Sequence, residues 1–119
     1  CGPPALLPRE LGRIAPGVTL ENDLRRAVQD ADVIMMLRVQ LERIHEPSMP
    51  AGEYFRFYGL RHEHMQLARP DAIVMHPGPM NRGREISSEV ADSQQSMILN
   101  QVENGVSVRM AVLERVLLQ

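Results

Sequence analysis

The fold of this chain is decided by one stretch, Ile73-Val74-Met75-His76-Pro77-Gly78-Pro79, in which an apolar run leads into a turn of prolines and glycine. A short apolar run that is bounded by turn residues indicates a buried strand. Proline lacks an N–H donor and has a fixed φ, so the turn presents backbone carbonyls at low entropic cost. Two interpretations are open: a rigid turn that closes a βα unit, or a set of carbonyl oxygens that grips a small amide-bearing substrate.

A second segment, Val33-Ile34-Met35-Met36-Leu37-Arg38-Val39-Gln40, has the same form, since an apolar strand runs into polar residues. In an extended chain the side chains of residues i and i+2 share a face, so Arg38 and Gln40 project together from the strand's carboxyl end. A guanidinium beside a carboxamide suits a ligand with a carboxylate and an amine. Ligands of open α/β sheets bind at this end of the strands. The alternative is that Arg38 pairs with a surface acid.

Strands alternate with helical patterns along the rest of the chain, which predicts an α/β fold with a parallel sheet. Segment 44–58 combines helix breakers with every aromatic residue of the chain, and we expect a docked loop there. Glycine costs about 1 kcal/mol relative to alanine inside a helix, so Asn104-Gly105 can divide the last helix in two. The other expected elements are a short helix containing Leu11 and Ile14, a strand at 18–20, a helix from Asn22, a helix at 60–68 and a helical stretch at 93–118.

Length and composition exclude several classes of protein. The 119 residues fit one domain, and the net charge of −2, with arginines interspersed among acids, disfavours nucleic-acid binding, which usually needs a basic stripe. The longest apolar run, 33–37, is too short to span a membrane, and no signal-peptide pattern opens the chain. The single cysteine, Cys1, rules out a disulfide within the chain and a cysteine-rich metal site. We expect a soluble protein of the cytoplasm, with no nucleic-acid or membrane partner.

Three segments of the chain, residues 36–43, 76–83 and 100–106, closely resemble the aspartate carbamoyltransferase family. The resemblance is specific, because the sister ornithine enzymes carry a tryptophan-serine-methionine-glycine signature near the first of these positions. They also carry cysteine-leucine-proline after the histidine. Neither signature is present here, and the chain contains no tryptophan.

The resemblance implies a Rossmann-like three-layer α/β domain with a parallel sheet, incomplete at its N-terminal side. Residues 1–119 would then be the aspartate-binding domain, the second of two, without its carbamoyl-phosphate domain. The family transfers a carbamoyl group from carbamoyl phosphate to the amine of L-aspartate and needs no cofactor. The serine-threonine-arginine-threonine motif that holds the phosphate in family members is missing, so we expect the chain alone to be inactive.

The resemblance also assigns site residues. Arg38 and Gln40 match positions that bind L-aspartate, and Gly78 and Pro79 match positions that contact carbamoyl phosphate, with Pro77 on the same shelf. No residue of the chain is expected to act as a catalytic group or a metal ligand. His76 is interpreted as a structural histidine at the end of a strand.

Two further expectations concern assembly. An ion pair between Arg82 and Glu85 could position the turn against the neighbouring domain, although a solvated pair is an equal alternative. Apolar residues lie on two sides of the last helix, which in the family packs on the carbamoyl-phosphate domain, and the family suggests a homotrimer. The alternative function is a non-catalytic carbamoyltransferase-like domain for binding or assembly.

Overall fold

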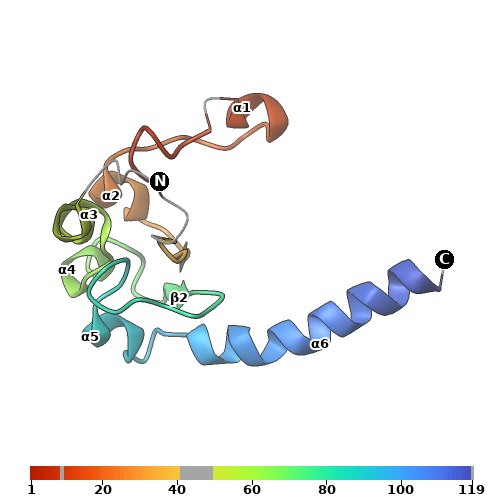
Figure 1. Ribbon diagram of the computed structural model, residues 1–119. Helices are drawn as coiled ribbons and strands as arrows, with labels where there is room; N and C mark the ends of the chain where they lie inside the picture. Colours follow the sequence, from red (N-terminus) through yellow and green to blue (C-terminus); the bar gives the residue numbers. More distant parts are fainter. Residues whose placement is uncertain (9, 41–49, 119) are drawn as a thin grey trace.

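The computed structural model describes residues 1–8, 10–40 and 50–118 of the chain (Figure 1). Its helices and strands follow one another in this order: α1 (Leu11–Ile14), α2 (Leu24–Val28), β1 (Val33–Met35), α3 (Ala51–Tyr58), α4 (His62–Met65), β2 (Ile73–Met75), α5 (Ser88–Ala91) and α6 (Ile98–Leu117).

The two strands form a parallel sheet, which confirms the fold class predicted from the sequence. Val33 pairs with Ile73 and Met35 with Met75, so the strands run in register. On the other side of β2, the backbone of Val74 receives a hydrogen bond from Met97 and donates one to Gln95, both 2.8 Å long. The strand β2 is therefore held along both edges, whereas within the described part of the chain β1 pairs only with β2.

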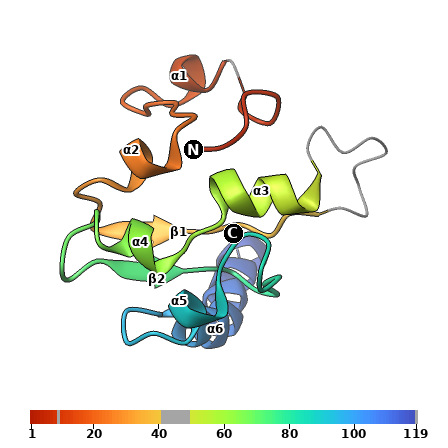
Figure 2. The same cartoon turned by 90° about the vertical axis from the view of Figure 1, so that its left-hand side faces the viewer.

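Helices lie on both faces of this sheet. Figure 2 shows α2 and α3 on one side and α5 and the start of α6 on the other. The core between these layers is apolar and includes the fully buried side chains of Leu60, Val74 and Ile86. This layered arrangement is the usual way in which a parallel sheet covers both of its apolar faces.

Two of the short helices start at side-chain caps. The carboxylate of Asp23 accepts a hydrogen bond from the N–H of Arg25 at the start of α2, and the hydroxyl of Ser87 accepts one from Val90 at the start of α5. Such caps satisfy N–H groups that the first helical turn leaves without a partner. The helix expected from Asn22 is confirmed, and α5 was not predicted from the sequence.

The loop expected at 44–58 is wrong for residues 51–58, which form α3, while residues 44–49 lie outside the described part of the chain. Pro50 occupies the N-cap position, where its missing N–H costs nothing, so this proline permits the helix that follows. Tyr54 and Tyr58 are one helical turn apart, and their rings pack with centroids 5.6 Å apart. The aromatic residues thus stabilise a helix rather than a docked loop.

Three other expectations differ from the structure. Residues 18–20 form no strand, because their backbone pairs with no described strand, and the helix expected at 60–68 is confined to α4. The last helix, α6, runs without interruption through Gly105, so the break expected at Asn104-Gly105 is wrong. The other nineteen residues of α6 take part in its hydrogen-bonded helix, and their combined stabilisation offsets the low helix propensity of Gly105. No helix in the described ranges combines the length and the apolar character that a membrane crossing requires.

His64 gives the fold a predicted dependence on pH. Burial lowers the pKa of His64 below its ordinary value of 6.5, helped by the positive charge of Arg61, and its Nδ1 accepts a hydrogen bond from the Arg61 N–H at 3.1 Å. Below pH 6.5 the unfolded state therefore binds a proton that the folded state resists, so stability falls as the pH drops through 6.5 toward the lowered pKa.

Urea unfolding at pH 7.5 and at pH 5 checks this expectation. His64→Asn, which retains an acceptor near the Nδ1 position, is expected to lose less stability than the unaltered protein between these two values. The control is His62→Asn, because His62 is exposed on the same helix and this variant should keep the original pH dependence. Equal losses in the unaltered protein and in His64→Asn would contradict the assignment.

Candidate functional site

The carboxyl ends of β1 and β2 meet at one edge of the sheet. Beyond the paired residues, the N–H of Met36 donates to the carbonyl of Met75 at 2.9 Å, so the two chains leave the sheet side by side. Residues 37–40 follow the first strand and residues 76–79 follow the second. The parallel register therefore brings the two segments singled out in the sequence to the same edge, the position where ligands of open α/β sheets bind.

The first of these segments carries Arg38 and Gln40. Arg38 is half-buried and Gln40 is exposed, and both lie just past the end of β1. Partial burial of the Arg38 residue reduces its contact with solvent, and reduced solvation strengthens the attraction between a guanidinium and a carboxylate. These two residues provide the cationic and amide groups of the candidate site.

The second segment is the turn formed by Pro77, Gly78 and Pro79, here called the Pro77–Pro79 turn. Both prolines are exposed, and Gly78 adopts a positive φ of 66° that residues with a side chain rarely occupy. The Gly78–Pro79 peptide bond is cis. A Cβ at position 78 would lie 3.1 Å from Cγ2 of Val102 in α6, so the turn also lies against the last helix.

Beneath the turn lies a buried polar pair that the sequence pattern does not predict as a site. The side chains of His76 and Glu85 are fully buried, with the His76 Nε2 3.4 Å from Oε1 of Glu85. The same carboxylate accepts a hydrogen bond from the N–H of Asn81. The carboxamide of Asn81 reaches the carbonyl of Val39 at 3.5 Å, which joins the turn to the segment that carries Arg38. The sequence feature that could have indicated this pair is the position of His76 directly after the apolar run 73–75.

The expected ion pair between Arg82 and Glu85 is wrong. Arg82 instead binds Asp92 through two hydrogen bonds of 2.6 and 2.8 Å, and Glu85 lies in the interior beside His76. The hydrogen bonds from Arg82 lower the pKa of Asp92, and those to Asp92 raise the pKa of Arg82. Both groups are exposed, so the pair adds little to stability. Sequence spacing favoured Glu85 as the ion-pair partner of Arg82. The backbone of Glu85, however, pairs with that of Leu60, and the Glu85 side chain turns inward.

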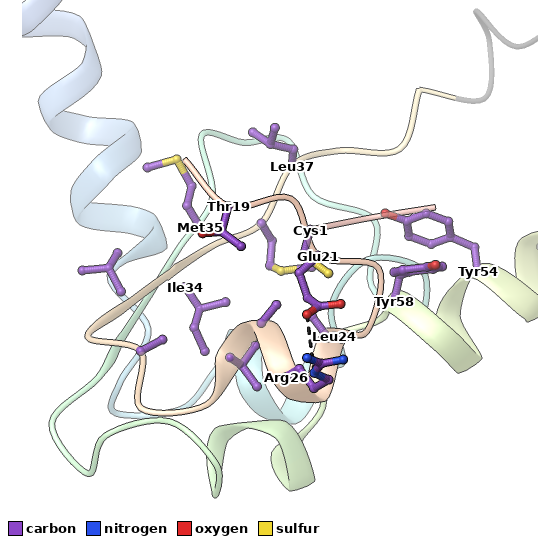
Figure 3. A pocket seen from close by; sticks show the side chains of 15 residues that line it. Cys1, Thr19, Glu21, Leu24, Arg26, Ile34, Met35, Leu37, Tyr54 and Tyr58 are labelled. Carbon is purple, nitrogen blue, oxygen red and sulfur yellow. Dashed lines mark ion pairs between the residues drawn. The ribbon is translucent and has the colours of Figure 1, made fainter. Parts of the chain in front are cut away.

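A separate groove of about 540 Å³ lies along β1, α2 and α3 (Figure 3). Its wall is mostly apolar, with an ion pair between Glu21 and Arg26 at 3.5 Å and the rings of Tyr54 and Tyr58 on one side. Burial, and then the negative charge of Glu85, raise the pKa of Tyr54. None of the five predicted site residues lines this groove, although Leu37, which immediately precedes Arg38, is part of its wall.

The described residues contain no group of three or more His, Cys, Asp or Glu side chains that could hold a metal ion. The edge offers groups that recognise small polar molecules: a guanidinium and a carboxamide from one strand end, and backbone oxygens from the other. Such a set suits a domain that binds a small molecule with carboxylate and amide groups.

Comparison with known proteins agrees with that class. Residues 12–116 match the aspartate/ornithine carbamoyltransferase family in the part described as the Asp/Orn binding domain. This match covers most of the chain, so the chain belongs to that family.

One relative is the aspartate carbamoyltransferase catalytic subunit of Solibacter usitatus (strain Ellin6076), which is 72% identical over 117 residues. The alignment covers 98% of this chain but 39% of that relative, so the chain spans about two fifths of its length.

Solved structures show the same relationship. Ornithine carbamoyltransferase from Burkholderia thailandensis E264 superimposes with a TM-score of 0.75 at 25% identity, over 94% of this chain and 36% of that one. Aspartate transcarbamoylase from Trypanosoma cruzi, solved in complex with carbamoyl aspartate and phosphate, superimposes with a TM-score of 0.61 at 29% identity. That alignment covers 75% of this chain and 27% of the other. These neighbours are consistent with the parallel α/β fold of the chain.

Proposed function

We propose that this chain is the aspartate-binding part of an aspartate carbamoyltransferase. The complete enzyme would transfer the carbamoyl group of carbamoyl phosphate to the amine of L-aspartate, in the cytoplasm, as a step of de novo pyrimidine biosynthesis. The observation that carries the proposal is the shared edge: the segment with Arg38 and the Pro77–Pro79 turn leave adjacent parallel strands together. The identity of 72% to a relative named for aspartate, and the missing ornithine signatures, favour aspartate as the amino acid.

Each group at the edge has a role in this reaction. Arg38 and Gln40 orient L-aspartate, with the guanidinium on a carboxylate. Carbonyls of the Pro77–Pro79 turn accept hydrogen bonds from the NH₂ group of carbamoyl phosphate, which discriminates it from donors that lack this group. The amine of aspartate attacks the carbonyl carbon directly, phosphate leaves, and the amine loses a proton. The contribution of the protein is to align the two reactants and to stabilise charge on oxygen.

The groups that hold the phosphate are proposed to come from a separate carbamoyl-phosphate domain. The last helix supports such a partner, because it exposes Val106, Met110 and Leu113, residues that are 57%, 65% and 60% exposed. A contiguous apolar surface of this kind favours contact with another protein surface. We propose a homotrimer for the complete enzyme. The same surface also fits the alternative of a non-catalytic domain that serves assembly.

A chimera tests the proposal. In this protein the chain replaces the matching segment of the Solibacter usitatus subunit, to which it aligns over 98% of its length. We expect the chimera to form N-carbamoylaspartate from carbamoyl phosphate and L-aspartate, and the purified 119-residue chain to show no turnover. The measurement is a colorimetric assay of N-carbamoylaspartate. A folded chimera without turnover would favour the non-catalytic alternative, and turnover by the chain alone would contradict the proposed division of the site.

A further inference from the structure

His76 makes an unusual contact beneath the Pro77–Pro79 turn. Its side chain is fully buried, and its Nδ1 accepts a hydrogen bond from the N–H of Gly78 at 2.9 Å. An acceptor nitrogen carries no proton, so the imidazole is the neutral tautomer with its proton on Nε2. The ring thus binds the backbone of the same turn that the sequence predicts as the binding segment for carbamoyl phosphate.

This contact determines which way the Pro77 carbonyl points. Gly78–Pro79 is the one cis peptide bond among the described residues. The Pro77–Gly78 peptide bond is therefore trans. In a planar trans peptide the N–H and the C=O point in opposite directions. The Gly78 N–H points inward to His76, so the Pro77 carbonyl points away from the interior. Pro77 itself is exposed. The side chain of His76 therefore fixes the direction of an oxygen at the edge of the sheet.

Glu85 holds the other side of the imidazole. Its Oε1 lies 3.4 Å from Nε2 of His76, a contact that does not meet the geometry of a hydrogen bond, so this buried N–H interacts with the carboxylate electrostatically. The carboxylate also accepts from the Asn81 N–H, and the Asn81 carboxamide donates to Oε2 at 3.4 Å. Through Asn81 the pair reaches the carbonyl of Val39, next to Arg38 in the chain.

We propose that His76, held in place by Glu85, is a positioning residue that aims the Pro77 carbonyl at the amide NH₂ of the carbamoyl donor. This inference rests on the proposed function, because the donor is the ligand of that function. The burial of both side chains gives the arrangement its precision, because each is held by its own hydrogen bonds, His76 to Gly78 and Glu85 to Asn81, in an interior with little room for other geometries. His76 itself does not touch the donor and takes no part in proton transfer.

Two substitutions separate the contacts of the ring. The oxygen of an asparagine side chain lies near the position of Nδ1, so His76→Asn retains an acceptor for the Gly78 N–H. His76→Gln places its amide near the position of Nε2, facing Glu85, and leaves the Gly78 N–H without an acceptor. Binding is measured by calorimetry on the chimera with two probes, phosphonoacetamide, which carries a carboxamide NH₂, and phosphonoacetate, which does not.

His76→Gln is expected to weaken phosphonoacetamide binding about tenfold, and phosphonoacetate binding less than about twofold, since one hydrogen-bond direction is lost. His76→Asn should bind both probes within about threefold of the unaltered chimera, because the Gly78 contact is rescued. A general loosening of the fold would weaken both probes alike, and that result would overturn the inference.

The remaining outcomes are also decisive. Equal phosphonoacetamide affinities in His76→Gln and in the unaltered chimera would overturn the inference while leaving the proposed function intact. If His76→Gln does not fold, His76→Asn decides, because a tenfold loss of phosphonoacetamide affinity in that variant contradicts a role through Nδ1. An unaltered chimera that binds phosphonoacetate but not phosphonoacetamide, and has no turnover, would overturn the proposed function and this inference together.

Discussion

Replacement of Arg38 by alanine is expected to lower kcat/KM for L-aspartate in the chimera by about 100- to 1,000-fold. Arg38 is a half-buried residue, and loss of an arginine that pairs with a substrate carboxylate costs roughly 3–4 kcal/mol, because the carboxylate is then left without its ion-pair partner. The Pro77–Pro79 turn is unchanged in this variant, so affinity for phosphonoacetamide should stay within about twofold. Steady-state kinetics with L-aspartate as the varied substrate provide the measurement.

The matched controls are two further substitutions. Arg38→Lys keeps the charge but loses the planar fork, and we expect a loss of about tenfold or more. Arg69→Ala removes an exposed arginine near the amino-terminal end of the same sheet, where Arg69 pairs with Asp32 at 3.2 Å. This variant should retain full activity. If Arg38→Ala and Arg69→Ala had similar kinetics, Arg38 would be a surface ion-pair residue and the assignment to L-aspartate would be wrong.

The part of the fold that the sequence predicted well is the pair of strands and their carboxyl ends. Apolar runs bounded by turn residues have a strong local signal, and the parallel pairing of 33–35 with 73–75 confirms the prediction from alternating strands and helices. The prediction for residues 51–58 failed because proline and glycine were interpreted as helix breakers. Pro50 precedes the first helical residue and Gly52 lies in the first turn, where both are tolerated.

The candidate site was likewise predictable only where its residues have a local sequence signal. Arg38, Gln40 and the Pro77–Pro79 turn follow from local sequence, and their shared edge follows from the parallel register. Their roles remain predictions. The interaction of His76 with Glu85 was not predicted, because it depends on the pairing of Leu60 with Glu85 and Ser87, which brings a distant segment beneath the turn. Nothing in the spacing of residues 82 and 85 indicates that Glu85 is buried. Tertiary contacts of this kind have no periodic signature.

Gly59→Ala is expected to destabilise the fold by about 2–3 kcal/mol, as overpacking of a closely packed position does. Gly59 ends α3 and is buried, with its N–H donating to the carbonyl of Phe55 at 3.0 Å. A Cβ at this position would overlap the ring of Phe55 and lie 2.6 Å from its backbone oxygen. The backbone oxygen cannot move without breaking the end of the helix. Hydrogen exchange of segment 51–60 in the chimera, followed by mass spectrometry, measures the loss.

The clash can be relieved only at the cost of a second contact. Leu60 is fully buried, its N–H donates to the carbonyl of Glu85 at 2.9 Å, and its own carbonyl accepts from Ser87 at 2.9 Å. A shift of Gly59 therefore disturbs the backbone that holds Glu85 beneath the Pro77–Pro79 turn, and we expect phosphonoacetamide affinity to fall together with stability. Gly52→Ala is the control, because no atom beyond the adjoining residues and the backbone of its own helix lies within 4 Å of its added Cβ, and alanine should stabilise α3 by up to about 1 kcal/mol. If both alanine variants were equally stable, the packing of Gly59 against Phe55 would not limit stability.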